Sequence, residues 1–561
     1  MEFPPWHWRI PEYFNIGTAC SDAHLGTPIA ERVAMVVDDD RGGVQQLSFA
    51  ELAERTSRFA ELLRDLGVAA GERVLIRLPN CLAYPTVFLG AMKRGTIPVP
   101  TSPLLTGDEV SYLARDSGAT VLVVDAASWR SLGGRLGSLP AVKHILTAQL
   151  VGAAPGGAPA ASPDPGALAA GPAERAGSAR TIELEAALDA ITRWHEAHPT
   201  RADEPAYLVY TSGTTGYPKG VLHAHRALLG RQPSSEYWFD FRPEGERVLH
   251  SGKLNWTYVL GTGMMDPLYR GHTAILHEGS NDAALWPRLI ARHEATTFIG
   301  VPTLYRQILQ KTRSTSADVP SLRHCMSAGE HLTEELLAGW SQRFGLEIYE
   351  GLGMTEFSYY LCQTRQRPIR YGSPGFAQPG HDVKLLDPAS LHEVAAGEEG
   401  MLCIPCADPG LLLRYWNQPE ETAAHFKGDW FLTGDYARRD ADGYFWFLGR
   451  KDDQIKSFGY RVSPHEVERV LKENPEVADA AVVGEEVAPG KTLVAAHVVR
   501  LPESRATADQ LLDWAREHLA SYKAPKVLYL VDELPRTANG KLMRRALDPG
   551  RALTRSSPPS R

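Results

Sequence analysis

The 561-residue sequence has no apolar run close to the roughly 20 residues that a membrane-spanning helix needs. Its first residues, MEFPPWHWRIPEYF, lack both a cationic lead and an apolar core, so we expect no signal peptide. Lys and Arg number 59 against 67 Asp and Glu, a formal net charge of -8, which argues against a dedicated nucleic-acid surface. We therefore expect neither a membrane segment nor a nucleic-acid partner.

Cysteine is also scarce. Six residues scattered over this length indicate reduced thiols and a cytoplasmic protein. Cys403 and Cys406 have C-x-x-C spacing, but a zinc site would need a second such pair and the sequence has none. Because the surrounding segment, MLCIPC, is apolar and strand-like, we interpret the two thiols as packing residues.

The length favours more than one domain, and 43% apolar with 22% charged residues is ordinary for a globular protein. Residues 150–181 are rich in Ala, Gly, Pro and Ser and have no periodicity, which is typical of a flexible surface insertion. The flanking segments alternate between strand and helix patterns, and such alternation predicts parallel sheets with helical crossovers. Upstream of the insertion the expected strands are 72–78, 97–100 and 119–125, and the expected helices are 51–67 and 84–95.

The alternation resumes after residue 205. The expected strands are 206–211, 272–277, 296–302, 322–329 and 346–353, and the expected helices are 285–295 and 304–310. From about residue 450 the pattern changes to a compact α+β unit of roughly 110 residues. Its first helix, 463–471, has Ser463 and Glu466 at capping-box spacing and Pro464 at its first position. Strands 478–484, 493–501 and 527–534 and helix 508–523 complete the unit. The polar junction between Gly449 and Gly459 suits either a hinge or a plain linker.

One loop, YTSGTTGYPKG at residues 210–220, has the composition of an anion site. Backbone N–H groups of a Gly/Ser/Thr loop after a strand form a concave anion site, and glycine lets the backbone approach closely. Lys219 adds a cation that can follow a phosphate. No Walker A pattern fits the loop, and a mobile polar loop is the alternative interpretation. The residues expected to hold phosphate are Thr211, Ser212, Gly213, Thr214, Thr215 and Lys219.

This loop resembles the phosphate loop of the adenylate-forming superfamily, which includes acyl-CoA synthetases, adenylation domains and luciferases. Five further segments match the family in order: SAGE at 327, YEGLGMTE at 349, the segment from 433, the segment from 451, and PRTANGKLMRRAL at 535. The resemblance implies an α/β fold with an N-terminal domain of three subdomains, two α/β sheets and a distorted β-barrel. It also implies a small mobile α+β C-terminal domain. The expected limits are 1–449, 450–548 and a polar tail, 549–561.

The resemblance also implies a reaction in two halves. A carboxylate attacks the α-phosphate of ATP to give an acyl-adenylate and pyrophosphate, and a thiol, usually that of coenzyme A, then displaces AMP. The implied cofactors are ATP, Mg²⁺ and coenzyme A. Lys541 matches the family's catalytic lysine, Thr355 its donor to the α-phosphate, and Glu356 its Mg²⁺ ligand. Thr355 and Glu356 are also compatible with a helix start, since Thr is a good N-cap.

Nucleotide binding falls to other positions by the same resemblance. Asp435 is expected to accept from the ribose hydroxyls and Arg450 to contact ribose or phosphate. Leu352 stands where many relatives have an aromatic residue on the adenine, so weaker base discrimination is expected. The remaining nucleotide-binding candidates are Ser327, Ala328, Gly329, Glu330, Glu350, Gly351, Gly353, Met354 and Phe447.

The second half-reaction is expected to follow a rotation of the small domain. Asp452 matches the hinge position and Lys456 lies on the face presented for the thiol step. Ser457, Phe458 and Gly459 match the coenzyme A tunnel, where a side chain at Gly459 would block the pantetheine arm. For each of these residues a charged turn is the alternative.

The acyl group is expected between residues 252–265, 298–305 and the SAGE segment, in a slot lined by Trp256, Tyr258, Gly261, Val301 and Ala328. Apolar walls suit a hydrophobic acid and disfavour amino acids, whose ammonium would need a carboxylate. Core packing is the alternative for each residue. The resemblance is closest to the benzoate-CoA and medium-chain acyl-CoA ligase branch.

We expect an acid–thiol ligase acting with free coenzyme A, as a monomer or homodimer. An enzyme that stops at the adenylate or loads a separate carrier protein is the main alternative. A nucleotide-binding regulator is disfavoured because Lys541 and Glu356 are present. A P-loop kinase or ATPase would release ADP instead of AMP.

Overall fold

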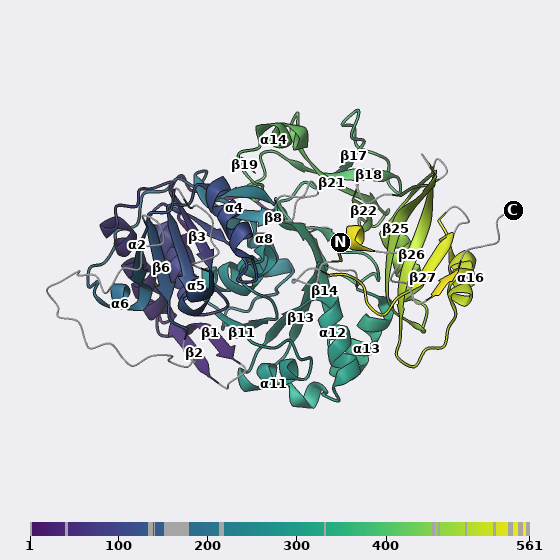
Figure 1. Cartoon of the computed structure of the whole chain (residues 1–561), viewed down its shortest axis with the longest axis horizontal. Coiled ribbons are helices and arrows are strands. Elements are labelled where there is room, and N and C mark those ends of the chain that lie inside the picture. Colours follow the sequence, from purple (N-terminus) through teal and green to yellow (C-terminus); the bar gives the residue numbers. More distant parts are fainter. Residues whose placement is uncertain are drawn as a thin grey trace.

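The structure is a computed structural model of the chain, shown in Figure 1. It describes residues 3–39, 43–132, 139, 141–150, 179–211, 218–329, 332–450, 455–457, 460–488, 491–519, 523–536, 542–547 and 554–556. Most of the expected insertion, residues 151–178, therefore lies outside the described residues. Two large sheets and a group of small antiparallel strands form the N-terminal part, and the C-terminal strands stand together at one end of the molecule (Figure 1).

The first sheet is parallel throughout, in the order β4-β3-β5-β6-β7. Its strands are β3 (Arg73–Arg77), β4 (Ile97–Pro100), β5 (Val121–Asp125), β6 (His144–Ala148) and β7 (Arg180–Glu183). The helices of this region are α2 (Phe49–Asp65), α3 (Ala83–Lys93), α4 (Gly107–Ser117), α5 (Ala126–Leu132) and α6 (Leu184–Asp189). Ser48 and Glu51 form a capping box at the start of α2, and Gly67 follows its end at a φ of +73°. The expected strands and helices upstream of the insertion are confirmed.

The second sheet has nine strands in the order β16-β15-β14-β13-β12-β10-β11-β1-β2. From β14 to β1 all neighbours are parallel, and β2, β15 and β16 are antiparallel edge strands. The strands are β1 (Val33–Asp39), β2 (Val44–Ser48), β10 (Arg247–His250), β11 (Thr273–Glu278), β12 (Thr297–Gly300), β13 (His324–Ala328), β14 (Ile348–Met354), β15 (Ser358–Cys362) and β16 (Phe376–Ala377). The central strands have the expected parallel pairing with helical crossovers.

The remaining helical segments of the N-terminal part are mostly short. They are α1 (Ile16–Ala19), η1 (Asp22–His24), α7 (Ala227–Gly230), α8 (Gln232–Tyr237), α9 (Thr257–Leu260), the π-helix η2 (Gly261–Met265) and α10 (Asp266–Tyr269). They continue with α11 (Leu285–Arg292), α12 (Pro302–Lys311), η3 (Ser316–Asp318), α13 (Glu334–Phe344) and α14 (Pro419–His425).

Two small antiparallel sheets form the third N-terminal subdomain. One contains β8 (Pro205–Thr211), β9 (Lys219–Ala224) and β19 (Arg414–Tyr415), and the other contains β17 (Lys384–Leu386), β18 (Glu399–Pro405), β20 (Phe426–Lys427), β21 (Trp430–Arg439) and β22 (Phe445–Arg450). The two sheets share a core that includes Val221, Leu402 and Phe431. The alternation rule is wrong for β8, which pairs antiparallel with β9. The link between them is too short for the dozen or more residues that a parallel crossover needs.

The C-terminal unit has its own core, which includes Val467, Val482, Val494, Leu511 and Leu528. Its elements are β23 (Ile455–Ser457), β24 (Tyr460–Val462), α15 (Pro464–Lys472), β25 (Val477–Ala488), β26 (Lys491–Arg500), α16 (Ala508–His518), β27 (Val527–Leu530), η4 (Arg544–Ala546) and β28 (Thr554–Ser556). The last of these strands pairs with β27, although the sequence predicts only a polar tail there.

The capping box expected at α15 is half formed. The Ser463 hydroxyl accepts the N–H of Glu466, as predicted. The Glu466 carboxylate, however, accepts from Lys523 Nζ at 2.7 Å. Lys523, which is distant in the sequence, therefore replaces the Ser463 backbone N–H as the donor to the Glu466 carboxylate.

Cys403 is fully buried in β18, Cys406 is half-buried just after it, and both thiols are free. Within the part of the chain that the structure describes, no helix is long and apolar enough to cross a bilayer.

Candidate active site

The carboxyl ends of four parallel strands meet at one edge of the nine-stranded sheet. The register places His250 beside Ile299, Gly300 beside Ser327, and Ala328 beside Gly351. The chain leaves β10 toward β11 on one side and returns as β12 on the other, so the strand order reverses at β10. In open α/β sheets ligands bind at such a switch point, outside the carboxyl ends of the strands.

Thr355 and Glu356 lie in the tight turn between β14 and β15, at this edge. The helix start considered for them is therefore wrong, because the chain reverses directly into an antiparallel strand. The Tyr415 hydroxyl donates to Glu356 Oε1 at 2.9 Å, and the Glu356 carbonyl accepts the N–H of Leu412 at 2.8 Å. Residues in and just before β19 therefore hold the turn in place, with the Glu356 carboxylate at its tip.

His223 supports the same turn from below. Its Nε2 lies 2.8 Å from the Thr355 carbonyl oxygen, which accepts, so Nε2 carries the proton. Burial lowers the pKa of His223 to about 3, and the ring is therefore neutral. It stacks on Tyr207 with ring centroids 4.7 Å apart.

The phosphate loop itself, residues 212–217, lies outside the described residues, but both of its ends are fixed. Thr211 and Lys219 face each other in the β8–β9 register. The Lys219 ammonium forms an ion pair with Glu421. Burial raises the pKa of Glu421, but the hydrogen bond and charge of Lys219 outweigh it and hold the pKa below the usual value. A bound phosphate would share Lys219 with this carboxylate.

The glycines of GLGMTE are needed for close packing. A Cβ on Gly351 would lie 2.4 Å from Cζ2 of Trp238, and one on Gly353 would lie 2.1 Å from the Ser358 carbonyl oxygen. Leu352 and Met354 pack on the core of the barrel strands. The side chain of Leu352 therefore contributes to that core, whatever it adds to an adenine site.

Two buried polar atoms beside these glycines lack partners among the described residues, Ser327 Oγ and Glu350 Oε2. Burial raises the pKa of Glu350 to about 8, so at neutral pH its carboxyl is mostly protonated and can both donate and accept. Because buried polar groups are normally paired, such atoms fit the edge of a bound base. The residues present therefore suit a nucleotide.

Asp435 and Arg450 face each other across β21 and β22. Asp435 is buried, and its N–H donates to Thr433 Oγ1 at 3.0 Å. The Phe447 ring lies 5.3 Å from the ring of His465 in α15. Gly449 has a φ of +114°, and its Cβ would approach His465 to 3.2 Å. This group of contacts joins the N-terminal part to the C-terminal unit.

Three of the expected acyl-pocket residues come together. The Trp256 and Tyr258 rings are 5.3 Å apart, and Tyr258 belongs to the same apolar cluster as Ala328. Trp256 also faces Gly329, whose φ is +91° and whose Cβ would lie 3.6 Å from Cη2 of the indole. Val301 instead packs on the opposite cluster, which contains Leu304.

Gly261, also expected in the acyl pocket, instead makes room for a buried arginine. A Cβ there would overlap the Arg231 guanidinium, which is buried and pairs with Asp266 at 2.6 Å. Arg231 Nε and the Tyr359 hydroxyl also donate to Asp266, at 2.9 and 2.8 Å. Asp266 therefore has no oxygen to spare for a substrate ammonium, in agreement with a non-amino-acid substrate.

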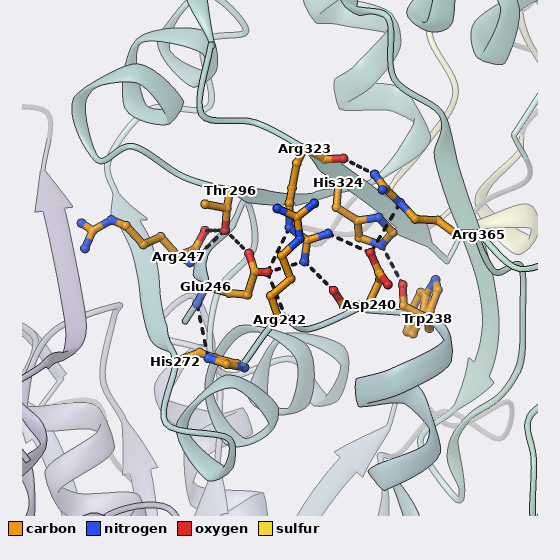
Figure 2. Close-up of polar contacts among 10 residues, drawn as sticks. All are labelled: Trp238, Asp240, Arg242, Glu246, Arg247, His272, Thr296, Arg323, His324 and Arg365. Atoms are coloured by element: carbon orange, nitrogen blue, oxygen red, sulfur yellow. Dashed lines mark hydrogen bonds and ion pairs between the residues drawn. The ribbon is translucent and has the colours of Figure 1, made fainter. Parts of the chain in front are cut away.

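Trp238, which the sequence analysis missed, is fully buried and packs in the same apolar cluster as Tyr258 and Ala328. Its Nε1 donates to the Tyr349 carbonyl at 3.1 Å, and its own carbonyl lies 2.7 Å from His324 Nε2. Figure 2 shows the contact with His324 beside a polar network at the amino ends of β10 and β13. There Arg323 Nε donates to Glu246 at 2.9 Å and its Nη1 donates to Asp240 at 2.9 Å. No sequence motif identifies Trp238 as a site residue, and it is recognised only from its contact with Gly351 in the structure.

Several predicted site residues lie outside the described residues: Ser212, Gly213, Thr214, Thr215, Glu330, Asp452, Phe458, Gly459 and Lys541. The side chains of Arg450 and Lys456 are likewise not described. Ser457 is buried in β23, and its hydroxyl donates to the Thr492 carbonyl at 2.9 Å. A cavity of about 430 Å³ lined by Phe3, Phe376 and Arg439 lies on the barrel strands, away from the strand ends described above.

An α/β sheet with a switch point, a carboxylate turn at its carboxyl edge and a separate C-terminal unit are compatible with a nucleotide-dependent acid-activating enzyme. The family models for the AMP-binding enzyme and for its C-terminal domain match residues 25–416 and 466–541. The chain belongs to the AMP-binding enzyme family.

The chain is 35% identical to the benzoate–CoA ligase of Thauera aromatica, over 96% of each chain. It is 29% identical to the mitochondrial acyl-coenzyme A synthetase ACSM3 of Homo sapiens, over 96% of this chain and 90% of that one. The crystal structure of the anthranilate CoA ligase AuaEII with anthranoyl-AMP matches with a TM-score of 0.80 and 30% identity, covering 96% of each chain. The chain is an acid–thiol ligase that uses ATP, Mg²⁺ and coenzyme A to form an acyl-adenylate and then a thioester.

Proposed function

We propose that the chain joins a benzoate-like aromatic acid to coenzyme A. The packing of the aromatic side chains of Trp256 and Tyr258 with Ala328, at the carboxyl edge of the nine-stranded sheet, carries this proposal. Flat aromatic walls suit a planar ring better than a flexible chain, whose ordering costs entropy. A medium-chain aliphatic acid is the second candidate, since an apolar slot also accepts methylene groups.

In the first half-reaction, Thr355 donates to the α-phosphate and the Glu356 carboxylate holds Mg²⁺ at the tip of its turn. Mg²⁺, when bound, neutralises phosphate charge. Lys541 provides the positive charge that lets two anions approach, and Asp435 holds the ribose hydroxyls. Lys219 and the glycine-rich loop bind the leaving phosphates.

For the second half-reaction we propose that residues 450–548 rotate about Asp452 as one domain against residues 1–449. The separate core of the C-terminal unit supports this division. Lys456 then faces the adenylate, and Ser457, Phe458 and Gly459 border the pantetheine arm. The acceptor is free coenzyme A, not a carrier protein, and the free thiols of the six cysteines support work in the cytoplasm.

The test is a panel of benzoates and C4 to C12 acids, scored by pyrophosphate release and by mass spectrometry of the coenzyme A thioester. We expect turnover of benzoates to exceed that of the aliphatic acids. Aliphatic acids as the better substrates would favour the second candidate, and adenylate without thioester would favour the carrier-loading alternative.

The Lys541→Ala variant separates the two halves. We expect loss of adenylate formation but retention of thioester formation from a supplied acyl-adenylate, because that lysine serves only the first step. An equal loss of both steps would contradict the two-pose scheme. Asp452→Pro is expected to slow only the second step.

A further inference from the structure

The carboxyl-terminal end of α4 lies against the hairpin of β8 and β9 that carries the phosphate loop. The Tyr210 hydroxyl, one residue before the end of β8, donates to Asp116 Oδ2 at 2.5 Å. Burial and the neighbouring Asp116 carboxylate raise the pKa of Tyr210, so the phenol keeps its proton and is the donor. Asp116 belongs to the helices of the first sheet and is 94 residues away in the sequence.

The other end of the loop is tied to the same aspartate. Trp416 Nε1 donates to the Asp116 carbonyl at 2.9 Å, and the backbone N–H of Trp416 donates to the Gly220 carbonyl at 2.7 Å. Gly220 follows Lys219, and a Cβ on it would lie only 2.9 Å from the Cβ of Trp416. Asn417 Nδ2 also donates to the Asp116 carbonyl, at 2.8 Å. Asp116 therefore holds β8 through its carboxylate and β9 through its carbonyl.

Further contacts make the end of α4 a fixed support. Arg73 Nε donates to the Ser117 carbonyl at 2.6 Å, and Arg73 Nη2 donates to the Gly118 carbonyl at 2.8 Å. The guanidinium thus satisfies carbonyls that the end of a helix leaves without partners. The same guanidinium lies 5.5 Å from the centre of the Trp416 ring. Tyr210 and Trp416 both pack on the apolar cluster of the first sheet.

Building on the proposed function, in which Lys219 and its loop bind the leaving phosphates, we propose that Asp116 is a positioning residue for the phosphate loop. It acts without touching the nucleotide, through Tyr210 at one end of the loop and Trp416 at the other. Ordering a loop costs conformational entropy, and a loop whose two ends are already fixed has less left to lose when a ligand binds. No motif marks Asp116 in the sequence, because only the fold brings it to the loop.

The experiment follows exchange of pyrophosphate into ATP, with the best acid of the panel, in Tyr210→Phe, which removes only the hydroxyl. We expect KM for ATP and for pyrophosphate to rise about tenfold, because a hydrogen bond to a charged group is lost. KM for the acid, and thioester formation from a supplied acyl-adenylate, should change by less than about twofold. A general loss of structure would instead impair all of these steps together.

Substitutions of the partner test whether the two residues act as a pair. Asp116→Ala should raise KM for ATP as much as Tyr210→Phe does, and the double variant should be no worse than either single one. Asp116→Asn keeps an acceptor oxygen and should recover part of the loss. Effects that add in the double variant would show that Asp116 does not act through Tyr210, and would overturn the inference.

Two controls separate this inference from the proposed function. Tyr444→Phe changes a buried tyrosine whose hydroxyl donates to the Pro368 carbonyl at 2.7 Å, and should leave every constant unchanged. Lys219→Ala tests the loop itself and should raise KM for ATP. If it does, but Tyr210→Phe raises KM for ATP no more than KM for the acid, the inference is wrong and the proposed function stands. If Lys219→Ala leaves KM for ATP unchanged, the proposed phosphate role of the loop fails, and this inference with it.

Discussion

At the amino ends of β10 and β13, buried charge is paired with charge, whereas at their carboxyl ends buried polar atoms stand without partners among the described residues. Arg323, Glu246 and Asp240 satisfy one another at the first edge (Figure 2). His250 Nε2 and Ser327 Oγ, with Tyr258 and Glu350 nearby, do not find partners at the second. Each buried polar group without a partner costs about 1–3 kcal/mol. His324 Nδ1 and Thr297 Oγ1 at the amino edge also lack partners among the described residues, so what distinguishes the two edges is the paired charge at the amino edge.

The largest effect is expected at the amino edge. Arg323→Met would leave Glu246, whose side chain is 1% exposed, as a buried carboxylate without its guanidinium. We expect the free energy of unfolding, measured in urea, to fall by about 3–5 kcal/mol. The matched control is Arg365→Met, since Arg365 is 36% exposed and lies 3.6 Å from Asp240; there the loss should stay below about 1 kcal/mol. Equal losses would mean that burial does not set the difference.

At the carboxyl edge, Glu356→Gln should affect the reaction and spare the fold. The amide oxygen can still accept from Tyr415, but a charge at the tip of the turn is lost. We expect adenylate formation, followed by exchange of pyrophosphate into ATP, to slow about 100-fold, or about 2.7 kcal/mol. The unfolding free energy should change by less than about 1 kcal/mol. Glu335→Gln on α13 is the control, and a stability loss as large as that of Arg323→Met would end the distinction between the two edges.

Gly351 in β14 lies against the Trp238 indole, and the Trp238 carbonyl contacts His324 at the amino end of β13, so Trp238 links the two edges. Gly351→Ala should cost about 1–3 kcal/mol of unfolding free energy, because its Cβ would lie 2.4 Å from the indole. Trp238→Phe removes the ring atoms in the way, so the double variant should be more stable than the sum of the two single losses predicts. Gly339→Ala in α13 has only a mild contact, at 3.3 Å, and should be neutral or stabilising. If the losses of Gly351→Ala and Trp238→Phe simply add in the double variant, the contact between Gly351 and the Trp238 indole does not limit the packing of β14.

The most gradual effect is a pH dependence from Glu350, which is spread over more than three pH units. Burial raises the pKa of Glu350 from the usual 4.5, which we take for the unfolded chain, to about 8 in the folded chain. Between these two pH values the folded state therefore holds a proton that the unfolded state has lost. The stability from this group is full below pH 4.5 and is lost as pH rises to about 8, with a slope of at most about 1.4 kcal/mol per pH unit. Glu350→Gln should flatten unfolding free energies measured between pH 5 and 8. An unchanged slope would place the titration elsewhere.

Most of the element pattern could be predicted from the sequence, because helix and strand periods are local properties. The strands from β3 to β5 and from β11 to β14 follow the expected alternation, and the glycine expected to stop α2, Gly67, follows its end. The strand β10 was not predicted. The turn residues Thr355 and Glu356 were found by motif, and Trp256 and Tyr258 by the resemblance of their segment to the family. Motifs also named residues such as Lys541 and Asp452, which lie outside the described residues, so their roles stay predictions.

The sequence by itself determined most of the order of the strands and helices and the match to an acid-activating family, and it named the residues predicted to meet the phosphates. Only the tertiary structure decided that β8 runs antiparallel, that Lys523 takes the Glu466 carboxylate, and that the rings of His250, Tyr258 and Trp238 pack together. Local patterns report what one segment prefers, whereas partners distant in the chain are chosen by packing, and a polar atom can be identified as unsatisfied only once all its neighbours are in place.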